Sequence, residues 1–190
     1  MKTFINTVIG LLLTLVSING NAYSYAAAGK EPVIDGREAI LIALSAQDYT
    51  QVTSEVNKLS DELDYLKKEH NVDLQSAFER AIVAKDANAI SALLDTAVYE
   101  EIVRRLDGAQ GNLNDYQVAK VLVVKSKLFL DLLSPNLSGE LRLQSSEAIS
   151  GLLKSIGNPG VFGVGQAPAD PTMFQSERSK LLQALAQFKQ

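Results

Sequence analysis

The sequence predicts an all-α protein, a bundle of about seven helices built from antiparallel helical hairpins. Three observations support this fold class. Apolar residues recur at three- and four-residue steps through most of residues 36–190, aspartates precede several of these segments, and a Gly/Pro-rich loop precedes the last one. A period near 3.6 residues is that of an amphipathic helix, and aspartate is a favoured N-cap residue. With 190 residues, 46% of them hydrophobic and 21% charged, the composition is typical of one globular domain.

Residues 1–28 have the layout of a secretory signal peptide. Lys2 is followed by the apolar stretch Phe4 to Val16, which is too short for the roughly 20 residues that cross a bilayer as a helix. Small residues would permit cleavage after Ala22, Ala26 or Ala28. We therefore expect export to the periplasm or the extracellular space, with no membrane span after cleavage. A retained N-terminal anchor is the alternative.

Composition excludes several function classes. The chain has no cysteine, which rules out disulfides, thiolate metal sites and a cysteine nucleophile. It has 22 Asp+Glu against 18 Lys+Arg and no basic run, so we expect no nucleic-acid partner. No cofactor motif is present, and we expect no cofactor. The oligomeric state stays open.

The first half of the exported chain predicts two successive helical hairpins. Residues 29–35 show no sustained periodicity and are expected to form a flexible leader to a single helical domain, residues 36–190. A first helix should end before Asp48, which would cap a second helix running to about Glu69. Residues 74–85 and 87–107 repeat this arrangement. Five positions match at a constant offset: Ala39 with Ala77, Ala43 with Ala81, Ala46 with Ala84, Asp48 with Asp86, and Val52 with Ile90.

These matches suggest an internal repeat, 36–72 and 74–108. The alternative is that alanine-rich helix chemistry alone produces two similar hairpins. Closely spaced alanines let two helices approach each other, and the aspartate that follows starts the return helix.

The second half predicts three more helices. The glycines of residues 108–112 should end the fourth helix, and Asn114 or Asp115 should cap the next. Residues 116–133 are apolar nearly all round and should form the central, most buried helix, with a β-strand at 121–124 as the alternative. A helix over 137–156 follows. The Gly/Pro-rich loop, residues 157–171, precedes the last helix, which Asp170 and Pro171 should start.

Candidate metal ligands are few. Asp61, Glu62, Asp64, Glu69 and His70 are close in sequence and could hold a hard cation. A solvated helix face with weak i,i+4 ion pairs explains the acidic residues better. His70 is the only histidine, at the polar end of a helix, and we expect it to be a capping or solvent-exposed residue.

Two groups of residues are candidates for binding a partner or a ligand. Val161, Phe162 and Val164 could form an exposed apolar loop tip, although we favour Phe162 folding back onto the end of the bundle. Tyr65, Tyr99 and Tyr116 could line a pocket between helices, although positions at the edge of the core explain them as well.

The leading functional hypothesis is an exported, non-enzymatic helical protein that binds an envelope protein or a small ligand. A carboxylate-based metal-handling accessory protein of the periplasm is the alternative. A hydrolase using a serine and His70 is a third possibility that no Gly-x-Ser-x-Gly motif supports. No residue is predicted to be catalytic.

Overall fold

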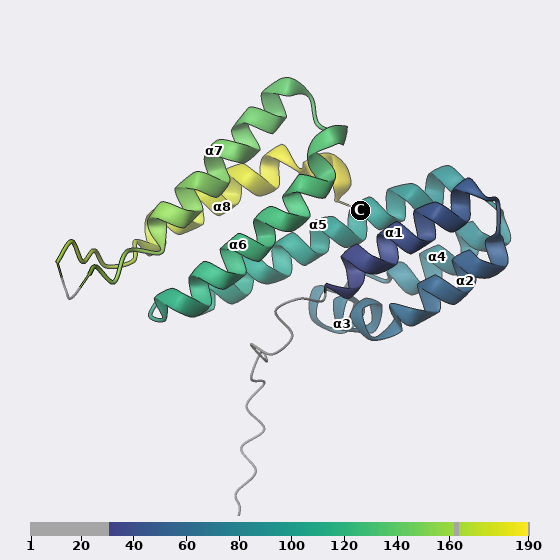
Figure 1. The fold of residues 1–190 in the computed structure, drawn as a ribbon, viewed down its shortest axis with the longest axis horizontal. Coiled ribbons are helices and arrows are strands. Elements are labelled where there is room, and N and C mark those ends of the chain that lie inside the picture. The colour runs from purple at the N-terminus through teal and green to yellow at the C-terminus, as the bar shows by residue number, and fades with distance from the viewer. Residues whose placement is uncertain (1–30, 162–163, 190) are drawn as a thin grey trace, which may run out of the picture. The chain divides into compact units, whose positions relative to one another are not determined.

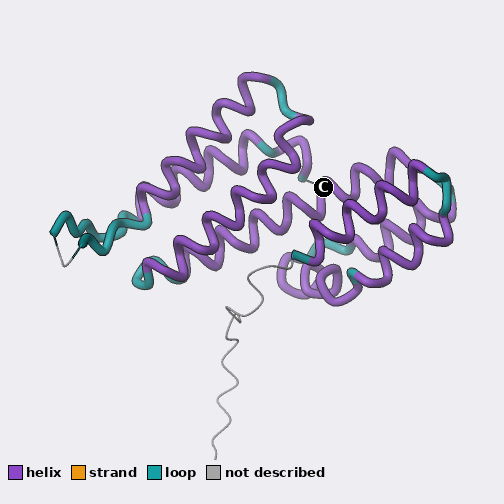
Figure 2. Tube along the Cα trace, viewed as in Figure 1, coloured by secondary structure: helices purple, strands orange, loops and turns teal. Residues whose placement is uncertain are grey.

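The computed structural model describes residues 31–161 and 164–189, and over these residues the protein is all-α (Figures 1 and 2). This confirms the predicted fold class, and the described part has eight α-helices where about seven were expected. They are α1 Pro32–Ser45, α2 Tyr49–Lys58, α3 Ser60–His70, α4 Leu74–Val83, α5 Ala87–Gly111, α6 Tyr116–Leu133, α7 Gly139–Ser155 and α8 Pro171–Ala184, with short 3-10 helices at Ser134–Asn136 and Ala186–Phe188. The predicted signal peptide, residues 1–28, lies outside the described residues.

Helix α1 begins earlier than the sequence indicates. Residues 31–35 were expected in a flexible leader, but Glu31 is the N-cap of α1 and Pro32 occupies its first turn. Proline is well tolerated there because the first N–H groups of a helix have no partner within the helix. Val33 is only 2% exposed. The leader prediction is therefore wrong for residues 31–35, because one buried side chain in the first turn leaves no visible periodicity.

The predicted helix from Asp48 to about Glu69 is in fact two helices, which accounts for the eighth. Helix α2 ends at Lys58 and α3 begins at Ser60, with Leu59 between them at φ −89° and ψ 7°. The Leu59 side chain is buried against Gly36 of α1, where an added Cβ would lie 2.7 Å from Leu59 Cδ2. The break thus depends on a contact with a distant part of the chain, which the local pattern does not encode.

Helix α5 is longer and more central than predicted. The glycines of residues 108–112 were expected to end it, and it ends at Gly111, four residues beyond the predicted bound at 107. An added Cβ at Gly108 would lie 3.2 Å from Leu122 Cδ1, so the glycine permits close packing of α5 on α6. Helix α5 contacts α1, α3, α4, α6 and α8 and carries more buried residues than α6. Helix α5, and not α6, is therefore the central helix, and residues 121–124 are helical.

The turns before α2 and α5 have the same construction, at the offset of the suggested repeat. Gln47 and Lys85 both adopt a left-handed conformation, with φ of 55° and 52°. The backbone N–H of Asp48 donates to Ala43 O and that of Asp86 to Ala81 O, both at 3.0 Å. Each aspartate then caps the following helix, as predicted.

In the second half, α6 packs on α5 and α7 packs on α8 (Figure 1). Asp170 caps α8, as predicted, and of the two predicted candidates for the cap of α6, Asn114 and Asp115, it is Asp115 that caps the helix. The large apolar residues Phe78, Phe129 and Phe174 are fully buried and lie in one continuous core with the leucines of α3, α5 and α6.

Candidate functional site

The segment between α7 and α8 forms a hairpin that two isolated β-bridges hold together. We define the hairpin arms as residues 157–161 and 164–169. Asn158 and Ala167 exchange two backbone hydrogen bonds of 2.9 Å, and Val161 and Val164 exchange two of 3.0 Å. In Figure 1 the arms extend beyond the adjacent ends of α7 and α8.

Glycines are required at two positions of the first arm. Gly157 and Gly160 have φ of 80° and 72°, a region that side-chain-bearing residues seldom adopt. An added Cβ at Gly160 would lie 2.6 Å from Val164 O, so the opposing arm also leaves no room for a side chain. Gly157 and Gly160 therefore fix the conformation of the first arm.

The base of the hairpin is fixed to both neighbouring helices. The Asp170 N–H donates to Ser155 O of α7 at 2.7 Å, and the Asp170 carboxylate accepts from Met173 N–H of α8 at 2.9 Å. One residue thus closes the hairpin and starts the next helix.

The hairpin arms expose two valines and carry no charge. Val161 is 72% exposed and Val164 is 78% exposed. No residue from Gly157 to Ala169 is charged. Of the three residues predicted at this loop tip, the structure places two valines in solvent, while Phe162 lies outside the described residues.

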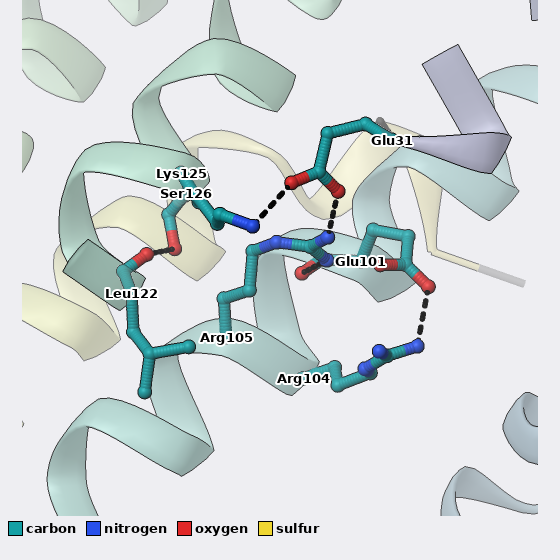
Figure 3. Close-up of polar contacts among 7 residues, drawn as sticks. All are labelled: Glu31, Glu101, Arg104, Arg105, Leu122, Lys125 and Ser126. Atoms are coloured by element: carbon teal, nitrogen blue, oxygen red, sulfur yellow. Dashed lines mark hydrogen bonds and ion pairs between the residues drawn. The ribbon is translucent and has the colours of Figure 1, made fainter. Parts of the chain in front are cut away.

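A second feature is a charged cluster between α1, α5 and α6 (Figure 3). The Glu31 carboxylate accepts from Arg105 of α5 and from Lys125 Nζ of α6, the latter at 2.8 Å. Arg105 also donates to Glu101, one helical turn earlier, and Arg104 donates to Glu101 at 3.1 Å. The sequence indicates the i,i+4 pair of Glu101 and Arg105, on a face expected to be solvated, but not its burial or its link to Glu31.

The charged cluster lies in the interior. Glu101 is 2% exposed and Arg105 is 7% exposed. The Arg105 guanidinium carbon lies 4.2 Å from the centre of the Phe129 ring, a cation–π contact. Buried charges are tolerated when they are paired and hydrogen-bonded, as these are. We interpret the cluster as a structural link that fixes the start of α1 to α5 and α6.

His70 is the last residue of α3, the helix end at which it was predicted, but its side chain is not open to solvent. Its side chain is 12% exposed, and Nδ1 lies 3.6 Å from Glu100 Oε2 of α5. Of the two expectations, capping or solvent exposure, the second is wrong, because α3 ends against α5 and covers the side chain. Burial raises the pKa of the Glu100 carboxyl, and burial also raises the pKa of the neighbouring Tyr99 hydroxyl.

The candidate metal ligands do not come together. Asp61, Asp64 and Glu69 are exposed on α3, and Asp64 pairs with Lys68 at 2.5 Å. Glu62 is half-buried. Within residues 31–161 and 164–189, no group of three or more His, Asp and Glu side chains is placed to hold a metal ion.

The three candidate tyrosines have separate surroundings. The Tyr65 ring lies 4.5 Å from the Arg104 guanidinium and 6.0 Å from the His70 ring. Tyr99 is buried at 4% exposure. Tyr116, the first residue of α6, lies 5.6 Å from Lys120 Nζ, measured from the ring centre. The three rings thus have different neighbours, and Tyr65 lies beside Arg104 of α5.

Comparison with family models, with curated proteins and with solved structures finds no match to this chain. None of the helices in the described residues is both long enough and apolar enough to cross a membrane.

Proposed function

We propose that this is an exported, non-enzymatic helical protein that binds an envelope protein through the hairpin arms. The observation that carries the proposal is the exposure of Val161 and Val164, at 72% and 78%, on a projecting and uncharged element. Single exposed apolar residues are common on protein surfaces. Here the two valines pair across a hairpin whose shape specific glycines fix, and exposed apolar patches often mark sites of protein association.

The form of the element favours a macromolecular partner over a small ligand. Small molecules are bound in concave pockets that cover most of their surface. The hairpin arms project and expose their apolar side chains, which suits insertion into a groove on another protein. The sequence carries a net charge of −4, which disfavours adsorption to anionic lipid as the main interaction.

Export itself rests on the layout of residues 1–28 and is tested separately. We expect the protein to be recovered from the envelope or the medium of its source cells, with an intact mass that corresponds to cleavage after Ala22, Ala26 or Ala28. Recovery in the cytoplasmic fraction at full length would contradict export while leaving the hairpin proposal to its own test.

Site-specific crosslinking in the source cells tests the binding role. A photoreactive residue at Gln166, which is exposed on the second hairpin arm, should form one defined adduct whose partner is identified by mass spectrometry. The matched control is the same photoreactive residue at Gln110, exposed at the end of α5. Replacing Val161→Asp in the Gln166 protein should abolish the adduct. The same adducts from both positions, or an adduct unaffected by Val161→Asp, would contradict the proposal.

A further inference from the structure

The outer face of α6 carries an apolar row that no described element covers. Val124 is 42% exposed and Leu128 is 49% exposed, and Val121 and Leu132 border them at half-buried positions. Steps of three, four and four along the sequence keep all four side chains on one face of the helix. The opposite face, with Ala119, Ser126 and Leu130, is buried.

This apolar row continues onto α1. Leu132 lines a groove of about 400 Å³ together with Ile34, Leu41 and Ile42, and Ile42 is 63% exposed. The row and the groove together offer an apolar surface wider than a single helix.

The positions in the row are symmetric about the middle of α6. In two antiparallel α6 helices related by a two-fold axis near residue 126, Val124 would face the second copy's Leu128. Val121 would face the second copy's Leu132 in the same arrangement. Such self-complementarity is what a symmetric homodimer requires, because each copy presents the same surface.

The charges beside the row follow the same symmetry. Lys120 and Asp131 lie about three helical turns apart, which places both on one flank of α6. About the same axis, Lys120 would face the second copy's Asp131, so the dimer gains two attractive pairs. Lys127, nearer the axis on this flank, is already paired with Asp131 at 2.8 Å, and the exposed carboxylate can accept from both lysines. On the other flank, Lys125 is neutralised by Glu31 at 2.8 Å.

We infer that the protein forms a two-fold symmetric homodimer in which the outer faces of two α6 helices pack antiparallel. A specific interface buries about 1,000 Å² or more in total, and the groove beside α1 extends the contact between the two helix faces toward that size. The hairpin arms do not contribute to this surface, so failure of the dimer would leave the proposed function untouched.

Analytical ultracentrifugation of the purified exported protein tests the dimer. The wild-type protein should sediment as a dimer at high concentration, and Leu128→Glu should sediment as a monomer. The melting curve by circular dichroism should show that the Leu128→Glu protein is folded. A wild-type protein that remains monomeric at its highest soluble concentration would overturn the inference.

A charge exchange tests the antiparallel geometry and guards against a variant that merely misfolds. Lys120→Glu and Asp131→Lys should each weaken the homodimer about tenfold, because two attractive pairs become repulsive. A mixture of these two variants should dimerise again, since each then supplies the charge that the other needs. The control Lys180→Glu, on α8, should leave dimerisation unchanged. A mixture no tighter than either single variant would overturn the antiparallel arrangement.

Discussion

The middle of α5 and the hairpin arms distribute charge and apolar area in opposite ways. Glu101 and Arg105 are buried at 2% and 7% exposure, whereas Val161 and Val164 on the hairpin arms are exposed at 72% and 78%. The buried charges are paired and join three helices. The exposed valine side chains bury little area and so contribute little to folding. The contrast separates residues that hold the fold from residues that are free to bind.

Two adjacent buried carboxylates on α5, Glu100 and Glu101, differ in their charged partners. Glu101 accepts from two arginines, whereas the Glu100 carboxylate faces the imidazole of His70, at 3.6 Å. Burial raises the pKa of Glu100, which means that its charged form is disfavoured in the folded protein. Two similarly buried carboxylates at neighbouring positions therefore have different charged partners.

The largest effect is expected at Glu101. Replacing Glu101→Gln removes a buried charge and takes away the carboxylate that accepts from both Arg104 and Arg105, so the free energy of unfolding should fall by about 3 kcal/mol. Urea unfolding at neutral pH measures this. The control Asp64→Asn, in an exposed pair with Lys68, should change it by less than about 0.5 kcal/mol. Equal changes in the two variants would remove the distinction between buried and exposed pairs.

An effect of opposite sign is expected at Glu100. Replacing Glu100→Gln keeps the shape and removes a charge that burial disfavours, so stability at neutral pH should rise by about 1 kcal/mol. Because the folded-state pKa is raised, the wild-type protein is favoured below the unfolded pKa and loses stability as pH rises through the folded pKa. That loss should be absent in Glu100→Gln. The same dependence of unfolding on pH in both proteins, measured from acidic to neutral pH, would contradict this.

A smaller loss is expected at the equivalent turns. Asp48→Ala and Asp86→Ala each remove the side chain that caps a helix, at a cost of about 1 kcal/mol. Because the two turns share their hydrogen bonds, the two losses should be similar. Thermal unfolding of both variants measures them, and a loss at only one turn would contradict the equivalence of the two.

Features set by neighbouring residues could be predicted from the sequence, and features set by distant contacts could not. The caps at Asp48, Asp86, Asp115 and Asp170 depend on the next three residues, and all four were predicted, Asp115 as one of two candidates with Asn114. The break at Leu59 depends on Gly36 in another helix, and it was missed.

Of the candidate functional features, the hairpin valines were identified because prolines and glycines surround them in sequence. The charged cluster was missed because Glu31 and Arg105 are far apart along the chain and neither stands in a motif. The charged cluster forms through contacts between distant segments, and the periodicity of the sequence does not indicate which segments meet.

The double variant Val161→Asp, Val164→Asp tests most directly whether the exposed apolar residues serve binding and not folding. The measurement is the yield of the crosslinked adduct from Gln166 in this variant and in the wild-type background, at matched amounts of folded protein. The account predicts that the adduct disappears while the free energy of unfolding stays within about 0.5 kcal/mol of the wild-type value. A retained adduct in a stably folded double variant would contradict it.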